Sequence, residues 1–232
     1  MQKTSDINRL SDELEISIRE DKQIEQRILR NLTSEYSSTR SGIHVTDLVL
    51  CLRQAVFRKL FPVPPGIKQL SYYLDGARRH EALEKLYSAN DPAHIVSEKK
   101  GVFEDVSFSI DLYFKMPIEF KTTRAREAIP EHWIRQLAYY MLATDSDVGI
   151  LQIQRIVPKD EDSIFPSYLV EFTNEEQRIG WLEEFRSRKE TFRMALDSGM
   201  PEWAPIYRGE NSWLCRQCPY KSRCDEIERT KL

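Results

Sequence analysis

The clearest pattern along the chain is an alternation of apolar and polar residues between positions 106 and 114. Every second residue from Val106 to Phe114 is apolar, and the residues between them are polar and include Asp111. A period of two residues is typical of a β-strand with one buried face. Residues 115–117, Lys-Met-Pro, predict a turn, so residues 118–123 are expected to return as the second strand of a hairpin.

The same alternation predicts how the two strands of the hairpin pair. With a three-residue loop, Asp111 lies opposite Lys121, Glu119 is diagonal to Asp111, and Leu112 faces Phe120. A slip of one residue would place apolar residues opposite charged ones, which favours this register. Two carboxylates and an ammonium are then expected within roughly 5–8 Å of one another. Such a group suits a metal-dependent phosphodiesterase, although an ordinary solvent-exposed polar face gives the same pattern.

Helical spacing of apolar residues alternates with strand patterns over the rest of the chain. Helices are expected over residues 7–32, 45–61, 69–89, 130–144 and 173–198, and further strands over residues 95–101, 148–157 and 167–172. Thr173 and Glu176 predict a capping box at the start of the last helix. This order predicts an α/β fold with a mixed sheet flanked by helices. Residues 1–40 are expected to form a helical arm and residues 41–232 a single domain.

Composition narrows the class of protein. The chain has 232 residues, a net charge of −3 and a pI near 5.9. It has no apolar run of membrane-spanning length, and its first ten residues are too polar for a signal peptide, so a cytoplasmic protein without a membrane segment is expected. Contacts with nucleic acid would depend on metal ions and on local basic clusters such as Arg78–Arg79, Lys99–Lys100 and residues 121–126.

The four cysteines form the second strong signal. Cys215, Cys218 and Cys224 have the spacing Cys-x2-Cys-x5-Cys in what is expected to be a terminal loop, and Cys51 is the other thiol of the chain. In a cytosolic protein this spacing favours metal ligation over disulfides. Both a zinc ion and an iron–sulfur cluster fit four thiolates, and the irregular spacing with Pro219 directly after Cys218 favours iron–sulfur.

Five features in a fixed order resemble one family of nucleases. They are Cys51, a Gly-x3-His motif ending at His80, Asp111, the Glu-Phe-Lys element at residues 119–121 and a Gln-x3-Tyr motif at residues 136–140, followed by the three-cysteine cluster. This order is similar to the RecB-like branch of the PD-(D/E)xK nuclease superfamily, and within it to the iron–sulfur nucleases of CRISPR loci, the Cas-four family. The chain departs from the family in lacking a glycine just before Asp111 and in its short interval from Asp111 to Glu119.

The resemblance implies a metal-dependent active site. His80, Asp111, Glu119 and the backbone carbonyl of Phe120 would bind one or two Mn²⁺ or Mg²⁺ ions, and Lys121 would orient a water or stabilise the phosphate. Positioning of DNA or of the lysine is implied for Gln136 and Tyr140, and phosphate contacts are expected for Arg78, Arg79, Arg124 and Arg135. A structural 4Fe-4S cluster held by the four cysteines would tie the N- and C-terminal segments together.

The resemblance also implies a deoxyribonuclease that shortens single-stranded DNA ends. Its expected role is prespacer processing during CRISPR spacer acquisition, an antiviral defence, with the CRISPR integrase proteins as partners. Three alternatives stay open: a freestanding repair or viral exonuclease of the same family, a DNA-binding subunit active only with the integrase, and a zinc-stapled restriction-type endonuclease. A homo-oligomer is compatible with the acidic chain and its helical arm.

Overall fold

A computed structural model describes residues 22–36, 40–90, 94–124, 129–156, 164–206 and 212–230. The helices are α2 (Lys22–Tyr36), α3 (Val45–Leu48), α4 (Leu52–Leu60), α5 (Ile67–Asn90), α6 (Glu131–Ala143), α7 (Glu175–Asp197), α8 (Ser212–Gln217) and α9 (Lys221–Thr230), with a 3₁₀ turn, η1, at Pro201–Trp203. The strands are β1 (Ile43–His44), β2 (Val96–Phe103), β3 (Val106–Phe114), β4 (Met116–Thr123), β5 (Val148–Arg155) and β6 (Ser167–Glu171). No described helix is long and apolar enough to cross a membrane.

The chain divides into two compact units. One consists of Met1–Ser38 and Pro64–Leu70, and the other of Thr39–Val63 and Ser71–Leu232. The larger unit thus begins at Thr39 and does not include residues 64–70. Of the helical arm expected over residues 7–32, the structure describes α2, and residues 1–21 lie outside the described residues.

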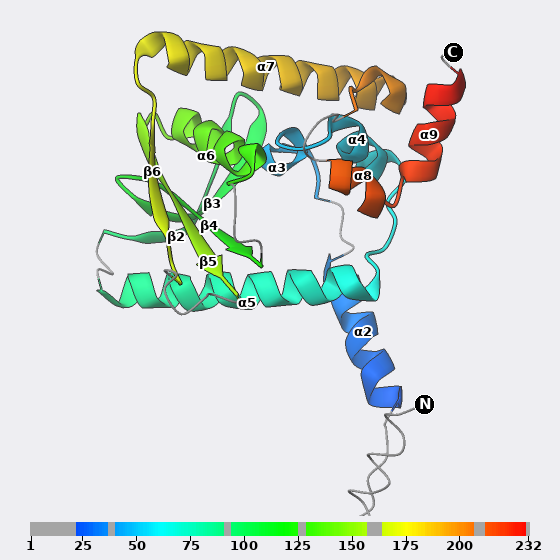
Figure 1. Cartoon of the computed structure of the whole chain (residues 1–232), viewed down its shortest axis with the longest axis horizontal. Coiled ribbons are helices and arrows are strands. Elements are labelled where there is room, and N and C mark those ends of the chain that lie inside the picture. Colours follow the sequence, from blue (N-terminus) through cyan, green and yellow to red (C-terminus); the bar gives the residue numbers. More distant parts are fainter. Residues whose placement is uncertain are drawn as a thin grey trace, which may run out of the picture. The chain divides into compact units, whose positions relative to one another are not determined.

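The larger unit contains a mixed sheet, as the sequence predicts (Figure 1). The strand order is β1-β3-β4-β5-β6. Strand β2 lies outside this order and pairs with β3 on the edge opposite β4. The β1–β3 and β4–β5 pairs are parallel, whereas β2–β3, β3–β4 and β5–β6 are antiparallel. The parallel β4–β5 pair requires a crossover, and α6 provides it. The expected α/β fold with flanking helices is confirmed.

Helices bury apolar side chains against this sheet. Leu137 and Met141 of α6 pack on Leu151 and Ile153 of β5. Leu83 of α5 belongs to a separate cluster that also contains residues 112, 118 and 120 of β3 and β4. The central strands are therefore shielded from water, and a polar group placed on them needs a partner inside the protein.

The β3–β4 hairpin is tighter than the sequence predicts. Leu112 pairs with Ile118 instead of Phe120, because Lys115 alone forms the turn, with a positive φ of 58°. The expected register is therefore wrong by two residues. A two-residue slip keeps every side chain on its own face, so the apolar pattern could not exclude it. Asp111 and Glu119 lie just beyond the last regular pair, Leu112–Ile118.

The helix expected over residues 45–61 is broken in the structure. It ends as α3 at Leu48 and resumes as α4 after Cys51, whose backbone is extended. The carbonyl oxygens at the break accept hydrogen bonds from arginines of other helices: Leu48 and Leu50 from Arg188, and Val49 from Arg135. These donors replace the helical hydrogen bonds that the break removes, which stabilises the interruption.

Two further expectations are corrected at helix ends. The cap of α7 is Asn174, whose side chain accepts from the backbone N–H of Gln177 at 2.8 Å, instead of the expected capping box of Thr173 and Glu176. The C-terminal segment, expected to be a loop, contains α8 and α9. Both are short and polar helices, for which the apolar period gives little signal.

Candidate functional site

The Glu-Phe-Lys element lies on β4 and meets the Gln-x3-Tyr motif of α6. Lys121 Nζ donates to Glu119 Oε1 at 2.6 Å and to Gln136 Oε1 at 2.8 Å. The Gln136 amide in turn donates to Glu119 Oε1 at 2.7 Å and to the Tyr140 hydroxyl at 2.9 Å. The two motifs thus form one hydrogen-bonded network, although Glu119 and Gln136 are 17 positions apart in the sequence.

Asp111 and His80 meet at the end of the same hairpin. The backbone N–H of Phe120 donates to Asp111 Oδ2 at 2.8 Å, so this carboxylate takes the place of the next ladder partner. Its other oxygen, Oδ1, lies 3.5 Å from Nδ1 of His80 on α5. The His80 ring also contacts the Phe120 ring edge to face, with centroids 6.0 Å apart. The structure therefore brings together the four residues for which the sequence predicts metal binding.

One oxygen of Glu119 has no partner. Glu119 is 2% exposed, and its Oε2 atom is buried without a hydrogen bond. Burial and the neighbouring charge of Asp111 raise the pKa of Glu119 to about 7, against the lowering effect of Lys121. Among the described residues, no other carboxylate oxygen is buried in this way. An orphaned carboxylate oxygen beside a second carboxylate fits a cation as its missing partner.

Electrostatics at His80 agree with an anionic site. Burial lowers the pKa of His80, but the hydrogen bond to Asp111 and the charges of Asp111 and Glu119 raise it more strongly, and the net shift is upward. A divalent cation would satisfy the same carboxylates and leave the neutral imidazole available as a ligand. Among the described residues, no group of three or more His, Cys, Asp or Glu side chains is already arranged around a metal position.

Glu84 is a residue of this region that the sequence interpretation missed. It lies one helical turn after His80 on α5, and burial together with the charges of Asp111 and Glu98 raises its pKa. A glutamate four positions after a motif histidine lies on the same helix face. This spacing was the available signal, but the helix pattern alone gave no reason to connect Glu84 with Asp111.

The four arginines expected to contact phosphate differ in their surroundings. Arg78 and Arg124 are exposed, and Arg79 pairs with Asp75 at 2.9 Å. Arg135 is 6% exposed and donates to Glu131, to Glu184 at 2.7 Å and to the Val49 carbonyl at 3.1 Å.

Arg135 therefore has a structural role. Its three nitrogen atoms all have protein partners, and burial leaves it no access to a ligand.

The cysteines from both ends of the chain influence one another. Burial raises the pKa of Cys215, and the charges of Cys51 and Cys224 raise it further. The pKa of Cys218 is also raised by burial and by the other three cysteines. Mutual repulsion of thiolates is the state that a bound metal relieves.

Arg53, which the sequence interpretation did not single out, joins the cysteine-bearing segments. It is 3% exposed and donates to Cys224 Sγ at 3.6 Å, to Glu228 at 2.7 Å and to the Ala204 carbonyl at 2.9 Å. Arg53 thus holds α4, which begins directly after Cys51, against the chain around Cys224. The contact of Arg53 with Cys224 thus brings segments 171 residues apart together.

Comparison with known proteins gives a family match over part of the chain. Residues 117–225 match the family model described as the PD-(D/E)XK nuclease superfamily. These residues form a PD-(D/E)XK nuclease superfamily domain. The match includes Glu119, Lys121 and the Gln136–Tyr140 motif, whereas His80 and Asp111 lie before it and are placed at the site by the structure. The expected enzyme class, a deoxyribonuclease, is confirmed by this domain.

Solved structures with a similar fold include the one described as SSO0001. It is 20% identical, with a TM-score of 0.62, and the alignment covers 86% of this chain and 95% of that chain. This likeness shows that the fold is shared over most of both chains. A phage-related exonuclease from Haemophilus somnus 129PT is 14% identical, with a TM-score of 0.48 and coverage of 70% and 97%.

An alkaline exonuclease (LHK-Exo) from Laribacter hongkongensis is 9% identical, with a TM-score of 0.49 and coverage of 75% of this chain and 97% of that chain. A comparison with curated protein sequences gave no match.

Proposed function

We propose that this chain is a metal-dependent exonuclease that shortens single-stranded DNA ends. The observation that carries the proposal is the orphaned Oε2 atom of Glu119, buried beside Asp111 and within a network that includes Lys121. A structural carboxylate in the interior is expected to have both oxygens satisfied. A buried carboxylate oxygen that lacks a partner in a nuclease domain is best explained as a cation ligand.

The residues that would hold Mn²⁺ or Mg²⁺ are His80, Asp111, Glu119 and the carbonyl of Phe120. Three of these groups contribute oxygen ligands, which both cations prefer, and the imidazole favours Mn²⁺. When bound, the ion supplies charge neutralisation at the scissile phosphate and a lower pKa for water. The N–H of Phe120 orients Asp111 by its 2.8 Å hydrogen bond to Oδ2, which leaves Oδ1 directed toward His80.

Lys121 is proposed to act on the substrate. Its ammonium is fixed by Glu119 and Gln136, so it occupies one position beside the carboxylates. From that position the ammonium can donate a hydrogen bond to a phosphate oxygen, or it can orient the attacking water. Its side chain is 17% exposed, which leaves an approach from solvent open.

Gln136 and Tyr140 are proposed to hold this lysine in place. The Gln136 side chain links Lys121, Glu119 and the Tyr140 hydroxyl in a single chain of hydrogen bonds. Burial and the charge of Glu119 raise the pKa of Tyr140 well above its ordinary value, so the hydroxyl keeps its proton. A protonated tyrosine anchors the amide without adding charge to the site. Exposed Arg78 and Arg124 stay as candidate phosphate contacts.

We also propose a 4Fe-4S cluster held by Cys51, Cys215, Cys218 and Cys224, with zinc as the alternative. Support comes from the mutual effect of the thiols on their pKa values and from the bridge that Arg53 makes to Cys224. Metal and sulfide analysis of anaerobically purified protein tests this. Iron and sulfide in equal amounts are expected, and zinc or no metal in folded protein would remove the iron–sulfur assignment.

The proposed biological role is prespacer processing in CRISPR spacer acquisition, together with the integrase proteins. Its support is the order of motifs from Cys51 to Cys224, which is similar to the Cas-four family. A freestanding exonuclease of the same superfamily has the same active site, so the two roles differ in partners and not in chemistry. Association with purified integrase on a DNA end distinguishes them.

The nuclease proposal is tested by cleavage of end-labelled single- and double-stranded DNA with Mn²⁺, Mg²⁺ or EDTA. We expect Mn²⁺-dependent shortening from the ends, with single strands degraded faster, and no shortening by Glu119→Gln. Folded protein that cleaves neither substrate, with or without the integrase proteins, would overturn the proposal.

A further inference from the structure

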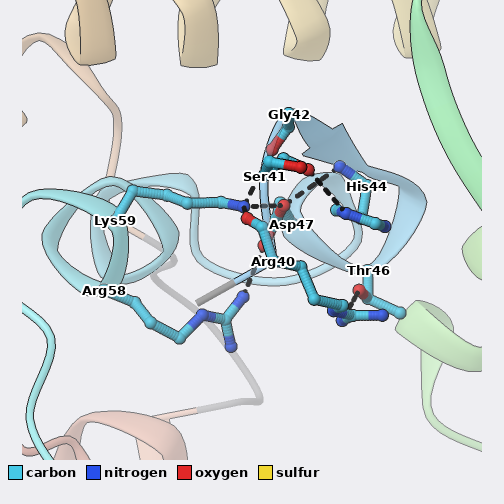
Figure 2. Close-up of polar contacts among 8 residues, drawn as sticks. All are labelled: Arg40, Ser41, Gly42, His44, Thr46, Asp47, Arg58 and Lys59. Carbon is cyan, nitrogen blue, oxygen red and sulfur yellow. Dashed lines mark hydrogen bonds and ion pairs between the residues drawn. The ribbon is translucent and has the colours of Figure 1, made fainter. Parts of the chain in front are cut away.

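A second group of charged residues lies at the start of the larger unit, around Asp47 (Figure 2). Asp47 is 3% exposed, and both of its oxygens have partners. Oδ1 accepts from Arg58 at 2.7 Å, while Oδ2 accepts from the backbone N–H of His44 at 3.0 Å and lies 3.4 Å from Lys59. The carboxylate is therefore fully used inside the cluster.

Lys59 is the internal cation of this cluster. Its Nζ donates to the carbonyls of Arg40 and Gly42 at 2.7 and 2.8 Å, and its side chain is only 13% exposed. Lys59 and Asp47 balance each other in charge and fix the backbone of residues 40–44. The outward charge comes from Arg40 and Arg58.

Within the part of the chain that the structure describes, the side chains of Arg40 and Arg58 each make one hydrogen bond. Arg40 Nη2 donates to Thr46 Oγ1 at 3.1 Å, and Arg58 Nη2 donates to Asp47, while the Arg58 side chain is 52% exposed. A guanidinium has five N–H donors, so both retain donors directed to solvent. Two anchored forks with an excess of positive charge match phosphate oxygens, which accept paired hydrogen bonds from arginine.

The position of this cluster connects it with the active site. His44 pairs with Ser107 of β3, and Asp111 lies four residues further along the same strand, about 13 Å away. Arg40 is near enough to Tyr140 for its charge to lower the pKa of that hydroxyl, against the larger effect of burial. Single-stranded nucleic acid follows positively charged surfaces, so one extended strand can reach both this cluster and the active site.

We propose that Arg40 and Arg58 form a phosphate-binding patch that holds the backbone of the DNA strand near the active site. This inference rests on the proposed nuclease function, and it names residues that no motif of the sequence indicated. Lys59 and Asp47 act as its scaffold, and Arg40 and Arg58 make the contacts. Binding at the patch is independent of base sequence, because it involves the DNA backbone.

Fluorescence anisotropy with a labelled single-stranded oligonucleotide in EDTA, over a series of salt concentrations, tests the patch. Loss of both arginines in Arg40→Gln/Arg58→Gln should weaken binding by about tenfold for each contact. The slope of log affinity against log salt should fall by about 1.4, since each phosphate contact on a single strand contributes about 0.7. Arg40→Lys/Arg58→Lys should keep the slope, because the charge is retained, and lose part of the affinity.

Controls separate this effect from folding. Arg193→Gln removes the same charge from α7, where its partner Asp105 is 3.9 Å away, and should bind DNA like the wild type. Because Arg58 pairs with buried Asp47, thermal unfolding of each variant is measured, and Arg40→Gln alone avoids that pair. An unchanged slope and affinity in folded Arg40→Gln/Arg58→Gln would overturn the patch.

Cleavage measured in parallel keeps the two proposals apart. Wild-type protein that cleaves DNA, with the double variant binding equally well, would leave the nuclease and remove the patch. Binding that depends on Arg40 and Arg58 without any cleavage would support the patch and overturn the nuclease proposal. Wild-type protein that neither binds DNA in EDTA nor cleaves it with Mn²⁺ would overturn both.

Discussion

Asp47 and Glu119 are two carboxylates with nearly equal burial and different partners. Asp47 is 3% exposed and Glu119 is 2% exposed. Asp47 accepts from or pairs with Arg58, Lys59 and a backbone N–H through both oxygens. Glu119 accepts from Lys121 and Gln136 through one oxygen, and its second oxygen has no partner.

This difference distinguishes a carboxylate that stabilises the fold from one that prepares a site. An isolated buried charge is unfavourable, so the orphaned oxygen of Glu119 is a cost that the folded protein carries until a cation binds. At Asp47 the corresponding cost is offset within the protein. Substitutions should therefore have opposite consequences at the two positions, and the following predictions test this.

The largest expected effect is on catalysis. Lys121→Ala should lower the rate of DNA cleavage by at least on the order of 10²-fold, because it removes a donor fixed beside the scissile phosphate. The measurement is the initial rate with Mn²⁺ at saturating DNA. Lys85→Ala, which changes an exposed lysine on α5, serves as the matched control and should cleave normally. A Lys121→Ala enzyme of wild-type rate would remove the proposed role of this lysine.

Asp47→Asn should destabilise the protein. The substitution leaves Lys59 with a neutral neighbour in a mostly buried position and removes the partner of Arg58, at a cost of about 2–3 kcal/mol in unfolding free energy. Urea unfolding followed by circular dichroism measures the change. Asp75→Asn breaks a more exposed pair with Arg79 and should cost less than about 1 kcal/mol. Equal effects of the two substitutions would contradict the structural role of Asp47.

Glu119→Gln should increase the unfolding free energy of the metal-free protein, whereas Asp47→Asn should lower it. The folded-state pKa of Glu119 is about 7, raised from 4.5, so the folded protein retains a proton that the unfolded chain releases between those values. Stability is lost as the pH rises through this window, and the loss is complete above pH 7. Glutamine avoids it and should stabilise the metal-free protein near pH 8 by on the order of 2 kcal/mol.

The pH dependence provides the internal control for this prediction. Near pH 4 the carboxyl is protonated in both states, so the advantage of Glu119→Gln should disappear. Unfolding in urea at both pH values, with EDTA present, makes the measurement. A substitution that destabilises the protein equally at both values would show that Glu119 is a structural residue like Asp47.

The sequence predicts which residues come together in space better than it predicts their geometry. The order of helices and strands follows from apolar periodicity, and the motifs at residues 80, 111, 119–121 and 136–140 do meet in space. The hairpin register was wrong because a two-residue shift leaves the faces unchanged. The structure has the tighter register, with Lys115 at a positive φ in the turn.

Long-range contacts explain the other differences. The break between α3 and α4 depends on arginines 86 and 140 residues away in sequence, and nothing in residues 45–61 indicates them. Arg135 was expected to contact phosphate, but it is buried and pairs with Glu131 and Glu184. Partners of this kind are supplied by the fold, so local patterns cannot predict them.

Calorimetric titration of Mn²⁺ into metal-free protein tests the central claim most directly. The claim is that the unpartnered oxygen of Glu119 belongs to a cation site. Wild-type protein should bind Mn²⁺, Glu119→Gln should lose that binding while remaining folded, and the Arg193→Gln control should bind normally. Equal Mn²⁺ binding by wild type and Glu119→Gln, or none by folded wild type, would contradict the account.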